Sequence, residues 1–244
     1  MILLLLSIIA LSLVTHAVWW QTRDQPRSWA DADWSSAGIL PPASREREAT
    51  VHVFAGRTGR WKGIFAHHTW IVTKSAGASR YTRYDVVGWG LPVRTDAYAP
   101  DGRWYGSAPK ILLTLRGGEA ERAIPRIGAA VAAYPYAGLG AYKIWPGPNS
   151  NTFVASVARA VPELAAALLP TAMGKDFAGW PLFIGSTPSG TGAQISVAGL
   201  LGLSIGWVEG LEINILGLVT GLDVRRPALK LPGWGRVGLP VERA

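Results

Sequence analysis

Cysteine is absent from this sequence of 244 residues, and its absence removes a whole set of functions. Without a thiol there is no disulfide bond, no thiolate nucleophile, no zinc–thiolate site and no lipid attached to an N-terminal cysteine. The compartment stays open, because a chain without cysteine is stable in reducing and in oxidising surroundings alike.

Charge is also sparse. Charged residues make up 16% of the chain, 49% of it is hydrophobic and the mean hydropathy is +0.19, which is apolar for a soluble protein and points to membrane contact. The net charge is +8, but the basic residues are scattered and form no compact run or known nucleic-acid motif. An anionic membrane surface explains this balance at least as well as a nucleic acid, so we expect no nucleic-acid partner.

A long apolar run lies at the N-terminus. Residues 2–20 match the roughly 20 residues needed to cross a bilayer, and Trp19, Trp20 and Arg23 stand where an interfacial belt would lie. The alternative is a cleaved signal peptide, but Thr15 to Ala17 is a poor cleavage site and a basic start is missing. We therefore expect residues 1–22 to be an uncleaved single-pass anchor in a bacterial cell membrane. The side of the membrane is left open; the positive charges after the segment favour a cytoplasmic domain.

After the anchor, residues 23–49 are rich in Pro, Ser and charge and predict an extended linker, pinned to the domain by Trp29 and Trp34. Residues 50–240 predict a single α+β domain, with a mostly antiparallel sheet and two or three helices. The expected strands cover 50–55, 63–74, 80–90 and 110–117, and the expected helices cover 118–135 and the segment that starts at Ser150.

The segment 193–222 is apolar enough to suggest a membrane span, but its pattern has a period of two. Large side chains occupy odd positions from Ile195 to Trp207 and small ones occupy the even positions. Glu209-Gly210 can supply a tight turn. This predicts a β-hairpin, and we expect Glu209 and the nearby Glu212 to be solvated rather than a paired acid and base. Asp176 is expected to cap or orient a loop.

The stretch GPNSNTFV (147–154) opens a predicted helix and allows two interpretations of Ser150. Asn149 and Ser150 are both good helix caps, because short polar side chains accept hydrogen bonds from free backbone N–H groups. Ser150 could instead be a nucleophile, with N–H groups near Asn151 holding an oxyanion. A serine nucleophile needs a nearby base.

The histidine pair in AHHTWIV supplies the base that this second interpretation requires. Neighbouring strand residues face opposite sides, so only one of the two can point at a shared site. His68 lies on the same predicted face as Trp70, where a polar ring is either functional or bonded to a buried partner. We expect His67 to face away.

The motifs HTWIV (68–72) and NSNTF (149–153) resemble those of the circularly permuted papain-like superfamily, which includes NlpC/P60, lecithin:retinol acyltransferase-like and PPPDE proteins. The resemblance implies that fold, with His68 as base and Ser150 in place of the family's nucleophilic cysteine. It also implies a polar residue that orients the ring, either Tyr84 or Asp85, and Asp85 is favoured because a carboxylate stabilises an imidazolium. Serine departs from the family pattern, since a hydroxyl cannot be held ionised as a thiolate can.

Longer stretches, among them RYDVVGWG, GPNSNTFV and LPGWGRVG, resemble a bacterial family of membrane-anchored proteins of unknown function (domain of unknown function 3750). That resemblance implies the anchor and the domain but no activity.

Two functions are therefore expected. The first is a membrane-anchored cell-envelope hydrolase or acyltransferase acting on an amide or ester of a cell-wall peptide or lipid, without a cofactor or metal. The alternative is a non-catalytic binding or scaffold module of the same fold at the membrane.

Overall fold

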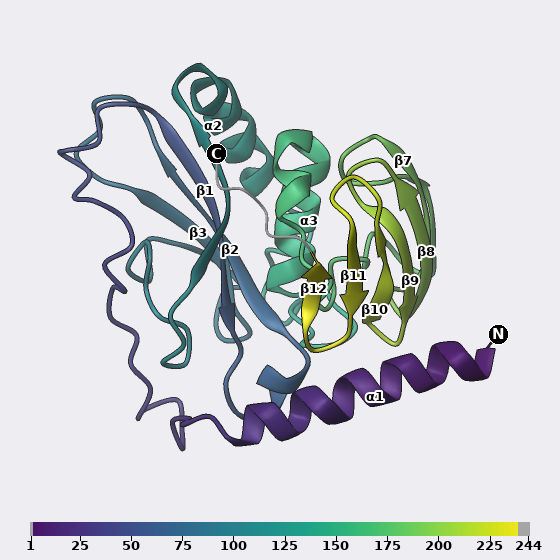
Figure 1. Cartoon of the computed structure of the whole chain (residues 1–244). Helices are drawn as coiled ribbons and strands as arrows, with labels where there is room; N and C mark the ends of the chain where they lie inside the picture. The colour runs from purple at the N-terminus through teal and green to yellow at the C-terminus, as the bar shows by residue number, and fades with distance from the viewer. Residues whose placement is uncertain (1, 239–244) are drawn as a thin grey trace.

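Two separate antiparallel sheets form the body of this α+β protein, and helix α3 lies between them (Figure 1). The computed structural model describes residues 2–238, so residue 1 of the predicted anchor and residues 239–240 of the predicted domain lie outside it. Where we expected one sheet, the structure has two, because the C-terminal third forms a sheet of its own.

Helix α1 (Ile2–Gln21) confirms the predicted N-terminal helix and is long and apolar enough to cross a membrane, a test that a signal sequence also passes. It runs along one side of both sheets (Figure 1). A stripe of four residues at helical spacing is buried against the body: Ile9, Ser12, His16 and Trp20. The Ser12 hydroxyl donates to the Pro232 carbonyl at 2.8 Å, and the indole of Trp20 donates to the Arg60 carbonyl at 2.8 Å.

The first sheet has five strands in the order β4-β3-β2-β1-β5. Their bounds are β1 (Thr50–Arg57), β2 (His67–Lys74), β3 (Thr82–Val86), β4 (Val93–Thr95) and β5 (Lys110–Arg116). The strand predicted over 63–74 begins later, at His67, because η1 (Arg60–Ile64) forms a short 3-10 helix before it.

One face of this sheet is covered by α2 (Gly117–Ala132) and α3 (Ser150–Ala160), with η2 (Pro162–Ala167) after them. Val53 and Ile71 of the sheet share a fully buried core with Ile127 of α2 and Phe153 of α3. These helices keep their apolar stripe toward the sheet, as amphipathic helices of a water-soluble core do.

The opposite face of the same sheet is aromatic and is covered by the linker. Phe54, Trp70 and Trp104 are buried there, and Trp34 of the linker packs edge-on against Trp104, with ring centroids 5.1 Å apart. Both faces of the five-stranded sheet are therefore shielded from water.

The second sheet has seven strands in the order β12-β11-β10-β9-β8-β7-β6. Their bounds are β6 (Leu182–Ser186), β7 (Gly192–Val197), β8 (Leu201–Gly206), β9 (Gly210–Ile215), β10 (Leu218–Asp223), β11 (Ala228–Leu231) and β12 (Gly235–Gly238).

The hairpin predicted over 193–222 is in fact four strands, β7 to β10. Its first expected strand is broken after Val197, where Ala198 and Gly199 have φ values of 51° and 73°. The break spans three residues, so β8 begins an even number of positions after Val197 and the odd positions stay on the same face. The turn predicted at Glu209-Gly210 is confirmed between β8 and β9.

Candidate functional site

The two histidines of β2 point to opposite faces of the five-stranded sheet, as their adjacency predicts. Nε2 of His68 lies 2.7 Å from Oδ1 of Asp85, and its ring stacks on Trp104 at a centroid distance of 3.5 Å. This is the aromatic face under the linker. His67 points to the helix-covered face, where its Nδ1 lies 2.8 Å from the Thr171 hydroxyl.

His68, Asp85 and Arg83 form a closed, buried network. Arg83 donates to Oδ2 of Asp85 from Nε at 3.0 Å and from Nη2 at 2.5 Å. Burial alone would raise the pKa of the Asp85 carboxyl, but the charges of His68 and Arg83 and their hydrogen bonds hold it below its ordinary value. Of the two predicted partners, Asp85 is the one that contacts His68, whereas Tyr84 packs on the helix side of the sheet.

The start of α3 has Asn149 as its cap and Ser150 as its first helical residue. The Asn149 side chain accepts from the backbone N–H groups of Asn151 and Thr152 in a reciprocal capping box with Thr152. The cap predicted as either Asn149 or Ser150 is therefore Asn149. Within residues 2–238, the Ser150 hydroxyl forms no hydrogen bond, although the residue is buried.

Asn151 ties the start of α3 to β2, and this contact separates the predicted pair. Its amide donates to the His67 carbonyl at 2.9 Å, and its Oδ1 accepts from the Thr69 hydroxyl at 2.8 Å. Thr69 and His67 share the helix-covered face, and His68 lies on the other. The structure therefore does not bring Ser150 and His68 together, and His67 is the histidine on the side of α3. The catalytic roles of Ser150, His68 and Asp85 stay predictions.

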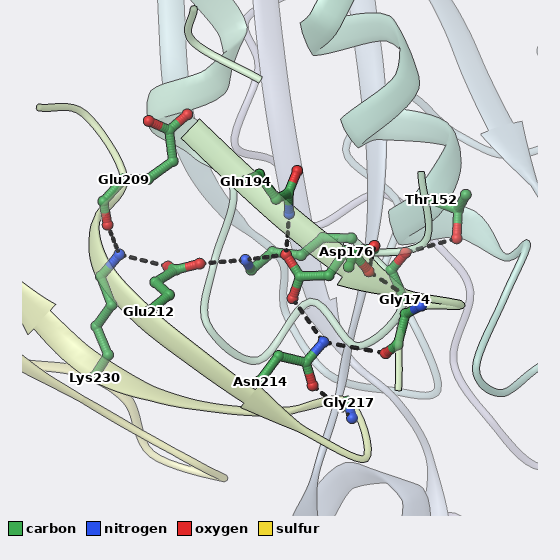
Figure 2. Close-up of polar contacts among 12 residues, drawn as sticks. Thr152, Gly174, Asp176, Gln194, Glu209, Glu212, Asn214, Gly217 and Lys230 are labelled. Atoms are coloured by element: carbon green, nitrogen blue, oxygen red, sulfur yellow. Dashed lines mark hydrogen bonds and ion pairs between the residues drawn. The ribbon is translucent and has the colours of Figure 1, made fainter. Parts of the chain in front are cut away.

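A second polar cluster links α3 to the inner face of the seven-stranded sheet (Figure 2). Lys175 donates to Asp176 at 2.9 Å and to Glu212 at 2.5 Å, and Lys230 donates to Glu212 at 2.5 Å. The amides of Gln194 and Asn214 donate to the two oxygens of Asp176.

This lysine–carboxylate cluster is buried and internally satisfied. Burial alone would lower the pKa of Lys175, but Asp176 and Glu212 raise it above its ordinary value. Burial alone would likewise raise the pKa of Glu212, but the charges of Lys175 and Lys230 hold that pKa below its ordinary value. Glu209 and Glu212 are thus buried, and the expectation of a solvated turn is wrong. Asp176, in the segment between η2 and β6, is buried too, and its carboxylate accepts from Gln194 and Asn214. Fixed, paired charges of this kind tie two elements together and offer no free base or nucleophile.

A cavity lies beside His67 of β2, at the C-terminal end of α1. Its volume is about 680 Å³, and it opens between the five-stranded sheet, the end of α1 and the β11–β12 turn. His67, Ala55 and Thr171 line it, together with four aromatic side chains: Trp19, Trp20, Tyr105 and Trp234.

The charge around this basic cavity is strongly positive. Four basic side chains and one acidic side chain line it: Arg23, Arg57, Lys110, Arg236 and Asp24. Arg236 is paired with Asp223 at 2.9 Å, whereas within residues 2–238 Arg57 has no acidic partner and donates only to the carbonyls of Gly63 and Gly233.

Burial sets the protonation of Arg57 and His67, which both line the basic cavity. It lowers the pKa of Arg57 to about 10, which leaves the guanidinium charged at neutral pH. Burial first, and then the positive charges of Arg57 and Lys110, hold the pKa of His67 well below its ordinary value, so its ring is neutral. A partly desolvated guanidinium without a carboxylate is suited to an anionic ligand.

Sequence reasoning missed this cavity, because its basic residues come from four separate segments of the chain. Arg57 and Lys110 belong to neighbouring strands, where Ala55 of β1 pairs with Lys110 of β5. Only the aromatic and basic residues just after α1 carried a recognisable pattern.

Among residues 2–238, no group of three or more His, Asp or Glu side chains could hold a metal ion.

A family model described as a protein of unknown function, DUF3750, matches residues 48–177, more than half of the chain. The chain therefore belongs to the DUF3750 family. No curated protein and no solved structure matched it. The matched segment takes in the five-stranded sheet, α2, α3 and the Lys175–Asp176 pair, and it ends before β6.

Proposed function

We propose that this chain is a membrane-anchored protein of the bacterial cell envelope that binds a phosphate-bearing anion in the basic cavity at the end of α1. Of the two functions expected from the sequence, this proposal corresponds to the non-catalytic alternative. The observation that carries the proposal is one cavity that combines an unpaired, partly buried Arg57 with aromatic walls at the end of a membrane-length helix.

The position of the cavity favours a ligand at the water–lipid boundary. Tryptophan is enriched at that boundary, and basic groups there attract anionic headgroups. Trp19, Trp20 and Arg23 follow the apolar part of α1 and line the cavity at the level where a bilayer would end. A phosphate, which accepts paired hydrogen bonds from a guanidinium, is the anion that fits Arg57 and its neighbour Lys110.

The hydrolase alternative receives no support from this cavity. A nucleophile needs a base within hydrogen-bond reach. The His67 ring, which lines the cavity, has its Nδ1 against Thr171, and Ser150 does not line the cavity. Binding therefore explains the cavity without a reaction.

Titration of the full chain in nanodiscs tests the proposal. Nanodiscs of phosphatidylcholine alone receive inorganic phosphate, and a second set contains an anionic phospholipid whose association is measured by native mass spectrometry. Loss of one charged hydrogen bond to the phosphate is expected to weaken binding about tenfold or more. Arg57→Gln and, separately, Lys110→Gln should each show this loss, and Arg80→Gln, an exposed basic residue outside the cavity, should not.

This design distinguishes two sources of the phosphate, a soluble compound and a lipid headgroup. Binding of inorganic phosphate alone indicates a soluble phosphate compound, and enrichment of the anionic lipid indicates a headgroup. Lys110 is exposed and its side chain forms no hydrogen bond or ion pair within residues 2–238, so the Lys110→Gln variant remains informative if Arg57→Gln unfolds. Equal binding by wild type, Lys110→Gln and Arg80→Gln would refute the site.

A further inference from the structure

Three adjacent strands of the seven-stranded sheet, β7, β8 and β9, carry their apolar side chains outward. Every outward position of β7, β8 and β9 is Ala, Val, Leu or Ile, and cross-strand pairing joins them into rows such as Ile195, Leu203 and Ile213. Ile195 is 42% exposed, Leu203 45% and Ile205 60%. No charged or polar side chain interrupts this outer face on the three strands.

The inward positions of the same strands are polar or glycine. One inner row is Gln194, Ser204 and Glu212, and the next is Ser196, Gly202 and Asn214. The five polar members of these rows are all buried: Gln194, Ser196, Ser204, Glu212 and Asn214. The sheet thus has the reverse of the arrangement that water favours, in which the apolar face is inside.

An exposed apolar patch of this extent requires an occupant. Soluble monomers rarely expose contiguous apolar patches above a few hundred Å², and larger ones mark a membrane or protein contact. An apolar outer face over a polar inner face is also the alternation of lipid-facing β-strands.

Helix α1 indicates which occupant covers the outer face. It is bound to the seven-stranded sheet through the β11–β12 turn, where the Trp234 indole donates to the Thr15 hydroxyl at 3.1 Å and Ser12 donates to Pro232. Its exposed side chains are themselves apolar, among them Leu4 and Leu11. Figure 1 shows the N-terminal end of α1 emerging on the same side of the molecule as β7 and β8.

The ends of the strands add the residues that favour a lipid boundary. Trp207 at the β8–β9 turn and Trp180 before β6 are among the exposed aromatic side chains, and Arg225 and Arg226 are exposed at the β10–β11 turn. Tryptophan and arginine around an uncharged aliphatic centre match the layers of a bilayer surface with anionic headgroups.

We infer that the outer face of β7, β8 and β9 lies on the lipid bilayer, as a second membrane contact beside α1. The seven-stranded sheet then has lipid on its apolar side and the lysine–carboxylate cluster on its polar side. This inference goes beyond anion binding in the basic cavity and does not depend on it, because no residue of the outer face of β7, β8 and β9 lines the cavity.

The absence of cysteine makes the test direct, since one introduced cysteine takes one spin label. The full chain is reconstituted in liposomes that contain anionic lipid and labelled at Leu203→Cys. The matched control is Leu91→Cys, a leucine of 56% exposure between β3 and β4, on the other sheet. Collision rates with oxygen, which partitions into lipid, and with a water-soluble nickel chelate are then compared.

The label at Leu203→Cys is expected to collide with oxygen several-fold more often than the Leu91→Cys label and with the nickel chelate several-fold less often. Nickel access equal to that of the control would overturn the inference, because the outer face would be in water. Low access to both reagents, with spin–spin coupling that disappears on dilution with unlabelled chain, would also overturn it in favour of a second copy of the chain. Loss of phosphate binding in Lys110→Gln leaves all these rates unchanged.

Discussion

The two sheets of this protein use the same alternation of side chains in opposite senses. In the five-stranded sheet, Val53 and Ile71 lie under α2 and α3, and Phe54 and Trp70 lie under the linker, so both faces are covered and carry apolar side chains. In the seven-stranded sheet, the covered face holds the lysine–carboxylate cluster and the open face is aliphatic. A period of two identifies strands but does not say which face is covered.

The contrast separates two sources of stability. Burial of apolar area stabilises the five-stranded half, as in most soluble domains. The inner side of the seven-stranded half gains little stability from apolar burial. It depends on complete pairing of buried charges, whose desolvation is costly. The first half should therefore be sensitive to lost volume, and the second to a lost charge.

The largest effect is expected from Glu212→Gln. The substitution keeps the shape but removes the one carboxylate that contacts both Lys175 and Lys230, at 2.5 Å each. Breaking a buried pair by removing one partner costs about 3–5 kcal/mol, because a charge is left uncompensated. Chemical denaturation in mild detergent, followed by tryptophan fluorescence, measures the free energy of unfolding.

Glu163→Gln is the control for the buried pair. Glu163 contacts Arg126 at 2.7 Å, but both side chains are more than 40% exposed, so the loss should stay below about 1 kcal/mol. Similar losses in the two variants would show that the lysine–carboxylate cluster is no more than a surface ion pair in its energetics.

A matched truncation in the two sheets should differ by several-fold. Leu115→Ala removes volume from the buried core of the first sheet, and a buried Leu→Ala change costs about 2–5 kcal/mol. Leu203→Ala changes the open face of the second sheet, where an exposed substitution in detergent is expected to change stability by less than about 0.5 kcal/mol. Equal losses would mean that the outer face is packed within the protein, and the contrast between the sheets would be lost.

The sequence predicted most of the elements, because their signals are local. The apolar helix, the strands β1, β2, β3 and β5, the helix after Asn149 and the turn at Glu209-Gly210 follow from periodicity, caps and turn residues. The short β4 was not predicted, because its segment is rich in turn residues. The split of the predicted hairpin was not visible, since a three-residue turn that preserves the odd positions leaves the periodicity intact.

The site was harder to predict, because it depends on which face a strand presents. Asp85 lies against His68 as predicted, and the signal was a carboxylate on the next strand, which suits an imidazole partner. The predicted approach of His68 to Ser150 is not found. Adjacent histidines of a strand face opposite sides, and His67, not His68, lies on the side of α3. The basic cavity needed the tertiary arrangement, as Arg57, Lys110 and Arg23 carry no shared motif.

The smallest predicted effect lies at the junction of the two halves, at the start of α3. Asn149→Ala removes the cap acceptor for the N–H groups of Asn151 and Thr152, at 2.9 and 3.1 Å, and should cost about 0.5–2 kcal/mol. Ser150→Ala should change the free energy of unfolding by less than about 0.5 kcal/mol, because its hydroxyl bonds to nothing within residues 2–238.

Asn149→Asp separates the cap from the other contacts of this side chain. The aspartate keeps the acceptor oxygen but loses the amide that donates to the carbonyls of Ile144 and Met173, at 3.1 and 3.0 Å. Stability near wild type in this variant would assign the effect to the cap, and a loss equal to that of Asn149→Ala would assign it to the tie with the segment that leads into the second sheet. A loss in Ser150→Ala larger than either would contradict the assignment of Asn149 as the cap.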